Sequence, residues 1–245
     1  SRAHMALLNG ASAICELPVC YASGSAEFFA QGAISILEGL GCIDTLCFGS
    51  ECGELSVLQH IAQLLLSESD TYSHMLQDAL KKGHSFPAAR HQALEKLTGD
   101  ASVSQILSEP NNILGIEYLK ALLQLDSPII PVCVTRVSND HHSKELTPSI
   151  SSATSIREIL EQNQIRPLFS RVPEALHDIY QMHYQKDFPV CLDDFSLLLH
   201  AAIYSCEDLT QISGISSDFK DRIFKMLKSD LSFEELISAC KTKNL

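Results

Sequence analysis

The first half of the chain alternates between helical spacing of apolar residues and short, continuous apolar runs. Apolar positions that recur every three or four residues predict helices over residues 2–9, 25–40, 54–66, 71–81, 87–97 and 112–125. Short apolar runs predict buried strands over residues 13–17, 43–48 and 129–137. Strands that alternate with helices through short connections are typical of a parallel α/β sheet, which is the fold class we expect.

The pattern changes near residue 167. A polar stretch over residues 139–148 is typical of an exposed loop, and a helix is expected over residues 152–162. After Pro167 the sequence predicts only short amphipathic helices, at residues 174–184, 192–205, 207–212, 218–227 and 233–241. We therefore predict an α/β domain over residues 1–166, followed by an all-α domain over residues 167–245.

Length and charge exclude several classes of function. The chain has 245 residues, of which 45% are hydrophobic, and such a composition is typical of a folded protein rather than a disordered one. Its longest apolar stretches, residues 61–66 and 129–134, fall short of the ~18 residues that a membrane span needs. The net charge of −12 disfavours nucleic acid unless a local basic patch overrides it. We expect no membrane and no DNA as partner.

The cysteines predict a reducing compartment. Nine cysteines are present, an odd number, and residues 1–10 lack the apolar core of a secretory signal, so we expect free thiols and a cytoplasmic location. Cys42, Cys47 and Cys52 are separated by four-residue gaps, and no second Cys or His pair follows at zinc-site spacing. We therefore predict no metal site, and we expect Cys42 and Cys47 to pack as buried thiols beside a strand.

Two polar turns could bind a nucleotide. Residues 48–53 (FGSECG) follow a predicted parallel strand, where ligands of α/β sheets bind and where Gly49 would allow close approach. The same residues would also suit an ordinary turn capped by Ser50 or Glu51, which the spacing alone favours. Asn111 most simply caps the next helix, although its amide could also reach a ribose or a base.

A third candidate is the hydroxyl-rich start of the helix expected at residues 152–162. Residues 150–157 (ISSATSIR) place four hydroxyls at a helix N-terminus, with Arg157 one turn later, and this arrangement suits a polyphosphate. The alternative is a redundant cap, with Arg157 paired to a nearby glutamate. In the preceding loop, Arg136 with His141 and His142 could contact phosphates, or the histidines could simply be solvated.

Several segments together resemble the bacterial tRNA(Met) cytidine acetate ligases, in the same order along the chain. They are residues 2–11 (RAHMALLNGA), 15–18 (CELP), 25–33 (SAEFFAQGA), 48–51 (FGSE), 110–115 (PNNILG), 152–157 (SATSIR) and 193–196 (DDFS). The resemblance implies a Rossmann-like nucleotidyltransferase core and an ATP-dependent enzyme. Such enzymes activate acetate as acetyl-adenylate and pass the acetyl group to N4 of the wobble cytidine of elongator tRNA(Met).

The resemblance also implies roles for particular residues. The family's ATP-binding positions are matched by Gly49, Asn111, Ile156 and Arg157. Hydroxyls of the same helix start would add phosphate contacts, at Thr154 and Ser155. Nucleotide or tRNA contacts are implied for two loop residues, Arg136 and His142. The expected substrates are ATP, with Mg²⁺, and acetate, and the helices after residue 167 would dock the tRNA.

The chain departs from the family at three places. It contains no His-x-Gly-His, whose histidines bind the reacting phosphates in this family, so the catalytic residues are unassigned; it also has no Arg-rich tail. In the loop, Asn or Asp and His141 stand where the family has Gly and Tyr. We expect an interior fragment that is inactive alone and that is marginally stable or self-associates through an exposed sheet edge. Another small-molecule adenylyltransferase and a non-catalytic helical interaction module are the alternative functions.

Overall fold

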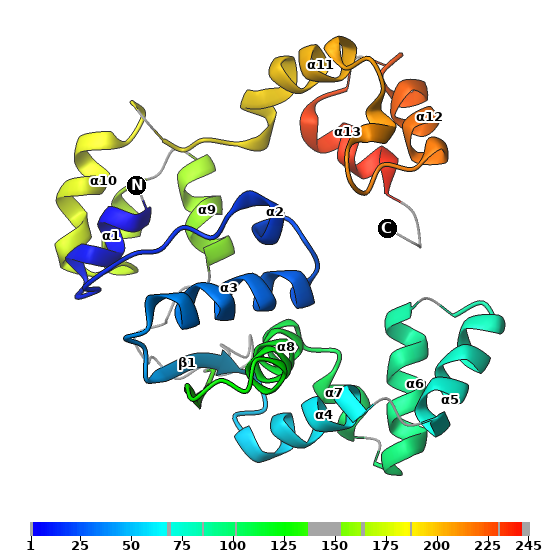
Figure 1. Cartoon of the computed structure of the whole chain (residues 1–245). Helices are drawn as coiled ribbons and strands as arrows, with labels where there is room; N and C mark the ends of the chain where they lie inside the picture. Colours follow the sequence, from blue (N-terminus) through cyan, green and yellow to red (C-terminus); the bar gives the residue numbers. More distant parts are fainter. Residues whose placement is uncertain are drawn as a thin grey trace. The chain divides into compact units, whose positions relative to one another are not determined.

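The computed structural model describes residues 2–67, 70–84, 86–100, 102–136, 153–162, 165–186, 188–229 and 231–241 (Figure 1). Contacts within the chain divide it into two compact units. The α/β unit comprises Cys15–Glu145, and the helical unit comprises Ser1–Ile14 with Leu146–Leu245. The functional division at residue 166 that the sequence predicts stays a prediction.

A two-stranded parallel sheet lies at the centre of the α/β unit. Strand β1 (Thr45–Ser50) pairs with β2 (Ile130–Thr135) in register from Thr45 opposite Ile130 to Ser50 opposite Thr135. Both strands were predicted from their apolar runs, but the expected burial is wrong for β2, whose Ile130, Val132 and Val134 are exposed on one face of the strand. The strand predicted over residues 13–17 is wrong, because no described segment pairs with those residues and a strand requires a hydrogen-bonded neighbour.

Two helices with clear local signals pack around this sheet. Helix α3 (Ala26–Leu40) begins at Ser25, whose hydroxyl accepts a hydrogen bond from the Phe28 amide, and ends at Gly41 with a positive φ of 64°. Helix α8 (Pro110–Gln124) contacts both α3 and β1. It crosses β1 closely at Gly115, where a Cβ atom would lie 2.6 Å from the Phe48 ring.

Four more helices complete the core of the α/β unit. After the short helix α2 (Val19–Ala22), they are α4 (Leu55–Ser67), α5 (Asp70–Lys81), α6 (Phe86–Thr98) and α7 (Ser102–Ile106). Their apolar faces join those of α3, α8 and β1 in one buried cluster, which includes Ile34, Phe48, Leu58, Ile61, Leu94, Leu107 and Ile116. This cluster fixes the end of β1 against the start of α8, where the candidate site lies.

The helical unit contains two separate apolar clusters. The first gathers Leu160, Leu168, Leu176, Ile179 and Tyr180, with Met5 packed against them. These residues come from α1 (Arg2–Leu8), α9 (Ala153–Glu161), two 3-10 turns at Arg166–Ser170 and Glu174–Leu176, and α10 (His177–His183). The expected helices are thus present, although the segments Arg166–Ser170 and Glu174–Leu176 wind more tightly than α-helices.

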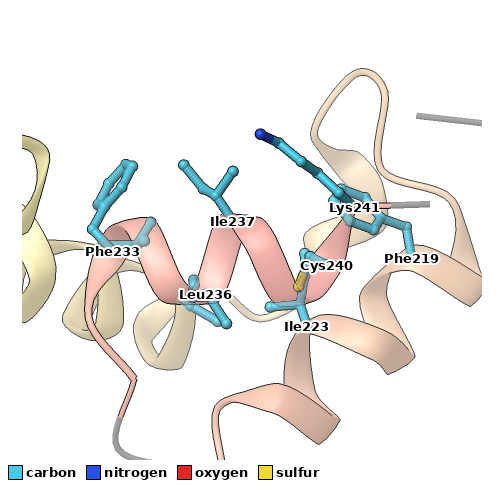
Figure 2. A pocket seen from close by; sticks show the side chains of 9 residues that line it. Phe219, Ile223, Phe233, Leu236, Ile237, Cys240 and Lys241 are labelled. Atoms are coloured by element: carbon cyan, nitrogen blue, oxygen red, sulfur yellow. The ribbon is translucent and has the colours of Figure 1, made fainter. Parts of the chain in front are cut away.

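The second cluster is formed by α11 (Ser196–Ser205), α12 (Ser217–Met226) and α13 (Phe233–Cys240), with 3-10 turns at Leu192–Phe195 and Leu209–Gln211. Leu236 and Cys240 face α12, whereas Phe233 and Ile237 project from the other side of α13 (Figure 2). These helices enclose an apolar pocket of about 230 Å³. Among the helices that the structure describes, none is long and apolar enough to cross a membrane.

Candidate functional site

The side chain of Asn112 holds the turn after β1 in place through hydrogen bonds. The Ser50 hydroxyl donates a hydrogen bond of 2.6 Å to Asn112 Oδ1, and the Cys52 amide donates to the same oxygen at 3.1 Å. The Gly53 amide in turn donates to Ser50 Oγ at 3.2 Å. Both Ser50 and Asn112 are buried, so this small network fixes the backbone that presents Gly49 at the carboxyl end of the strand.

Glu51 joins this turn to the start of α8. Its carboxylate accepts hydrogen bonds from the Asn111 side-chain amide and from the Asn112 backbone amide. Partial burial raises the pKa of the Glu51 carboxyl, but the hydrogen bonds from Asn111 and from nearby backbone amides outweigh it and hold the pKa below its usual range. The Glu51 carboxylate therefore satisfies a free amide at the helix N-terminus from a distant part of the sequence.

The simplest prediction for Asn111, a helix cap, is wrong. Helix α8 begins one residue earlier, at Pro110, and its N-cap is Glu109, whose side chain makes no capping hydrogen bond. Proline suits the first helical position, so the following residue lies inside the first turn. The Asn111 side chain is consequently available for contacts outside its own helix.

Arg136 follows the end of β2 and brings a guanidinium group to Glu51 and Asn111. Its guanidinium Nη1 donates a hydrogen bond of 3.4 Å to Asn111 Oδ1, and its Nε lies 3.9 Å from Glu51 Oε1. Its backbone amide bonds the Ser50 carbonyl oxygen at 2.9 Å. A Cβ atom on Gly49 would lie 3.2 Å from Arg136 Cγ. The structure thus brings Gly49, Asn111 and Arg136 together at the carboxyl ends of two parallel strands.

The other predicted binding residues belong to the helical unit. Ile156 packs against the first apolar cluster of that unit, and Arg157 is exposed on α9. Thr154 and Ser155 lie in the first turn of α9, as predicted. His141 and His142 lie outside the described residues. The predicted residues therefore form two groups, one in each unit, rather than one group within a single unit.

The cysteine prediction needs one correction. Cys42 and Cys47 are exposed rather than buried. The strand alternation explains Cys47, because its neighbour Phe48 faces the core and Cys47 therefore faces the opposite side of the sheet. No group of three or more His, Cys, Asp or Glu side chains in the described parts of the chain could hold a metal ion.

The sequence did not reveal that Asn112 and Glu51 join the turn after β1 to the start of α8 by hydrogen bonds. Asn112 appears in the sequence only as the neighbour of Asn111, and Glu51 only as a turn residue. The available signal was the adjacent pair of asparagines after a proline. One side chain of such a pair faces inward when the helix begins at the proline, and the inward one needs partners.

Comparison with known proteins shows the family to which the chain belongs. The chain matches the model of the HIGH Nucleotidyl Transferase family over residues 1–245, so it belongs to this family. It is 38% identical over 251 residues to the tRNA(Met) cytidine acetate ligase of Acetivibrio thermocellus, which covers 99% of this chain and 60% of that protein. It is 39% identical over 243 residues to the ligase of Caldanaerobacter subterraneus subsp. tengcongensis, which covers 99% of this chain and 61% of that protein.

Two solved structures share the fold over the whole chain. The apo form of Thermotoga maritima TmcAL has a TM-score of 0.88 at 29% identity, and the match covers 100% of this chain and 59% of that one. The form bound with alpha-thio ATP has a TM-score of 0.87 at 29% identity, with 100% and 58% covered. The predicted fold class and the resemblance to the tRNA(Met) cytidine acetate ligases are confirmed. The chain spans about 60% of the length of the curated relatives it matches.

Proposed function

We propose that this chain supplies the ATP-binding and tRNA-docking part of an enzyme that acetylates N4 of the wobble cytidine of elongator tRNA(Met). The observation that carries the proposal is the joining of Gly49, Asn111 and Arg136 at the carboxyl ends of β1 and β2. Open α/β sheets bind nucleotides at this place. Support comes from relatives that are tRNA(Met) cytidine acetate ligases and from the related structure that binds alpha-thio ATP.

The α/β unit would hold the nucleoside part of ATP. Gly49 has no side chain to block a ring or ribose at the strand end. The Asn111 amide has one N–H engaged with Glu51 and its Oδ1 accepts from Arg136, so it offers its second N–H and the other lone pair of Oδ1 to a ribose or base. Arg136 would lie beside the nucleotide or the tRNA, and His142 is proposed for the same role.

The start of α9 would hold the phosphates. Amide N–H groups at a helix N-terminus, the hydroxyls of Thr154 and Ser155 and the Arg157 guanidinium suit a polyphosphate with its Mg²⁺. Ile156 of the same helix packs against the first apolar cluster of the helical unit. Arg157 would stabilise the charge that develops as pyrophosphate leaves.

The reaction has two group-transfer steps. An acetate oxygen attacks the α-phosphorus of ATP, the bond from that phosphorus to the bridging oxygen breaks, and pyrophosphate leaves. The N4 nitrogen then attacks the acetyl carbonyl carbon, the carbonyl–phosphate bond breaks, AMP leaves and N4 loses a proton. In the proposed division, residues 1–166 bind ATP and acetate, and residues 167–245 dock the tRNA.

Ligand-induced stabilisation tests the proposal without requiring turnover. A ligand that binds the native state raises the melting temperature by an amount that grows with the logarithm of its concentration divided by its Kd. We expect MgATP and 5′-O-(N-acetylsulfamoyl)adenosine, a stable acetyl-adenylate analogue, to raise the Tm of the chain. The Arg157→Ala variant should lose the ATP effect, whereas Arg166→Ala, which changes another exposed arginine of the same unit, should keep it.

The outcomes separate the functions that the sequence leaves open. An equal or larger shift with analogues of longer or unrelated acids would favour a different adenylyltransferase. No shift with any nucleotide would favour a non-catalytic interaction module. A full ATP effect in Arg157→Ala would refute the phosphate role of Arg157.

A further inference from the structure

A second cavity of about 500 Å³ lies within the helical unit. It is bounded by α1, α9, α10 and the segment that follows α10, and its lining includes Arg2, Arg157, Tyr180, His183, Phe188 and Val190. Cavities of about 300–1,000 Å³ are typical of small-molecule and cofactor sites. Acetate, with four non-hydrogen atoms, would leave most of this volume empty, so the cavity suits a larger ligand.

The lining combines aromatic and cationic groups. The rings of Tyr180 and Phe188 meet edge to face, with centroids 5.5 Å apart, and form an aromatic wall. Burial raises the pKa of the Tyr180 phenol, which therefore stays uncharged and does not repel an anion. Arg2 and Arg157 contribute positive charge to the same cavity. An aromatic wall with nearby arginines is the chemistry that recognises an unstacked nucleotide with its phosphate.

The charge of the surrounding sequence agrees with an RNA ligand. Residues 1–14 and 153–190 together contain five Lys or Arg and five Asp or Glu, with three histidines, whereas the whole chain has a net charge of −12. The acidic excess therefore lies in other parts of the chain. A neutral region with locally clustered arginines repels a polyanion far less than the rest of the protein does.

We propose that this cavity receives one unstacked nucleotide of a single-stranded RNA, with its base against Tyr180 and Phe188 and its phosphate on Arg2. The inference rests on the proposed function, because an enzyme that modifies a base must take that base out of its stack. Arg157 lines this cavity and is also proposed to bind ATP phosphates.

Binding of a labelled RNA tests this proposal. We would measure fluorescence anisotropy of a fluorescein-labelled anticodon stem-loop of tRNA(Met) with the full chain. Val190→Trp should fill the cavity mouth and weaken RNA binding about tenfold, comparable to the loss of one stacked base. Met182→Trp is the matched control, because Val190 and Met182 are both 61% exposed and Met182 does not line the cavity.

Arginine variants test the phosphate contact separately. Arg2→Gln should weaken RNA binding and lower the slope of log K against log salt by about 0.7, as expected for one lost phosphate contact to a single strand. Arg166→Gln should leave the slope unchanged. Circular dichroism checks that each variant is folded, and the Tm shift with MgATP should persist in Val190→Trp and Arg2→Gln.

Each other outcome would overturn the inference. It fails if the parent chain does not bind the stem-loop, or if Val190→Trp binds RNA as well as Met182→Trp does. It also fails if Val190→Trp removes the ATP effect and spares RNA, since the cavity would then hold a free nucleotide. These results differ from failure of the proposed function, which would show as loss of ATP and acetyl-adenylate binding in the parent chain.

Discussion

The Ser50 hydroxyl donates a 2.6 Å hydrogen bond to Asn112 Oδ1, across 62 positions of the sequence. Ser50 is 0% exposed and Asn112 is 1% exposed, so water cannot replace a lost hydrogen-bond partner of either side chain. The other end of the Asn112 amide donates to the Ile106 carbonyl oxygen at 3.1 Å. Asn112 thus joins three segments, the end of β1, the turn after it and the end of α7, behind the candidate nucleotide site.

Asn112→Leu should therefore be strongly destabilising. The substitution leaves the Ser50 hydroxyl, the Cys52 amide and the Ile106 carbonyl without their buried partner, at a cost of about 2–3 kcal/mol. Urea denaturation would measure the free energy of unfolding. Asn9→Leu is the control, since the Asn9 side chain donates a hydrogen bond to the Met5 carbonyl oxygen at an exposed site. Its free energy of unfolding should fall much less than that of Asn112→Leu. Equal losses in the two variants would contradict this account.

Glu51 should give the chain a pH-dependent stability. Because the folded-state pKa of Glu51 is lowered, its contribution is fully present above the unfolded pKa of about 4.3 and is lost as pH falls through the lower folded value. Glu51→Gln should therefore be less stable than the parent at pH 7, and the difference should vanish at acid pH. Melting curves of the parent and of Glu51→Gln at several pH values would measure the difference at pH 7 and its disappearance at acid pH.

The Asn111→Leu variant tests whether the Asn111 hydrogen bond causes the lowered pKa of Glu51. The Asn111 side chain is the principal group that lowers the Glu51 pKa, so its removal should move the acid loss of stability to higher pH. A parent and an Asn111→Leu variant with the same pH profile would show that this hydrogen bond does not set the pKa of Glu51.

The local sequence predicts the elements of this fold better than their partners. The runs that became β1 and β2 and the helical spacing that became α3 are local, and each predicted the right kind of element, although β2 is more exposed than expected. The segment at residues 13–17 has the same apolar character but no described strand beside it. A strand depends on a hydrogen-bonded neighbour, which an apolar run by itself does not specify.

The candidate site shows the same limit on local reasoning. Motif resemblance indicated Gly49, Asn111 and Arg136, and the structure brings them together. The sequence could not show which of the two adjacent asparagines is buried, because this depends on the helix starting at Pro110. It also could not show that α1 joins the same compact unit as α9 and α10, since α1 contacts Glu174–Leu176, a segment far along the sequence.

A buried carboxylate in the α/β unit should also control stability. Glu117 is 3% exposed and pairs with Arg90 at 2.9 Å and with Lys120 at 2.6 Å. Glu117→Gln removes the buried carboxylate that pairs with Arg90 and with Lys120, which keeps only the half-exposed Glu27, and should cost about 3 kcal/mol in urea denaturation. Glu27→Gln removes the half-exposed carboxylate that pairs with Lys120, and should cost less than about 1 kcal/mol. Similar losses would show that burial of Glu117 does not matter.

The exposed face of the sheet should promote self-association. Ile130, Val132 and Val134 of β2 are exposed and lie on one face of the strand. Exposed apolar faces and unpaired strand edges favour contacts between copies. We expect sedimentation velocity to show oligomers that increase with concentration, and Val132→Lys to reduce them. Val19→Lys changes an exposed valine outside the sheet and should have no effect; equal effects would point to a surface other than β2.

Gly49 should matter for ATP binding and not for folding. A Cβ atom there would lie 3.2 Å from Arg136 Cγ, so the Arg136 side chain would have to move away from Asn111. Gly49→Val should therefore weaken MgATP binding about tenfold, or about 1.4 kcal/mol, in isothermal titration calorimetry. Gly39→Val is the control, because nothing lies within 4 Å of a Cβ atom at that position on α3. If Gly49→Val binds ATP as tightly as the parent does, the nucleotide does not approach the end of β1. The proposed nucleotide contacts of Asn111 and Arg136 would then be refuted as well.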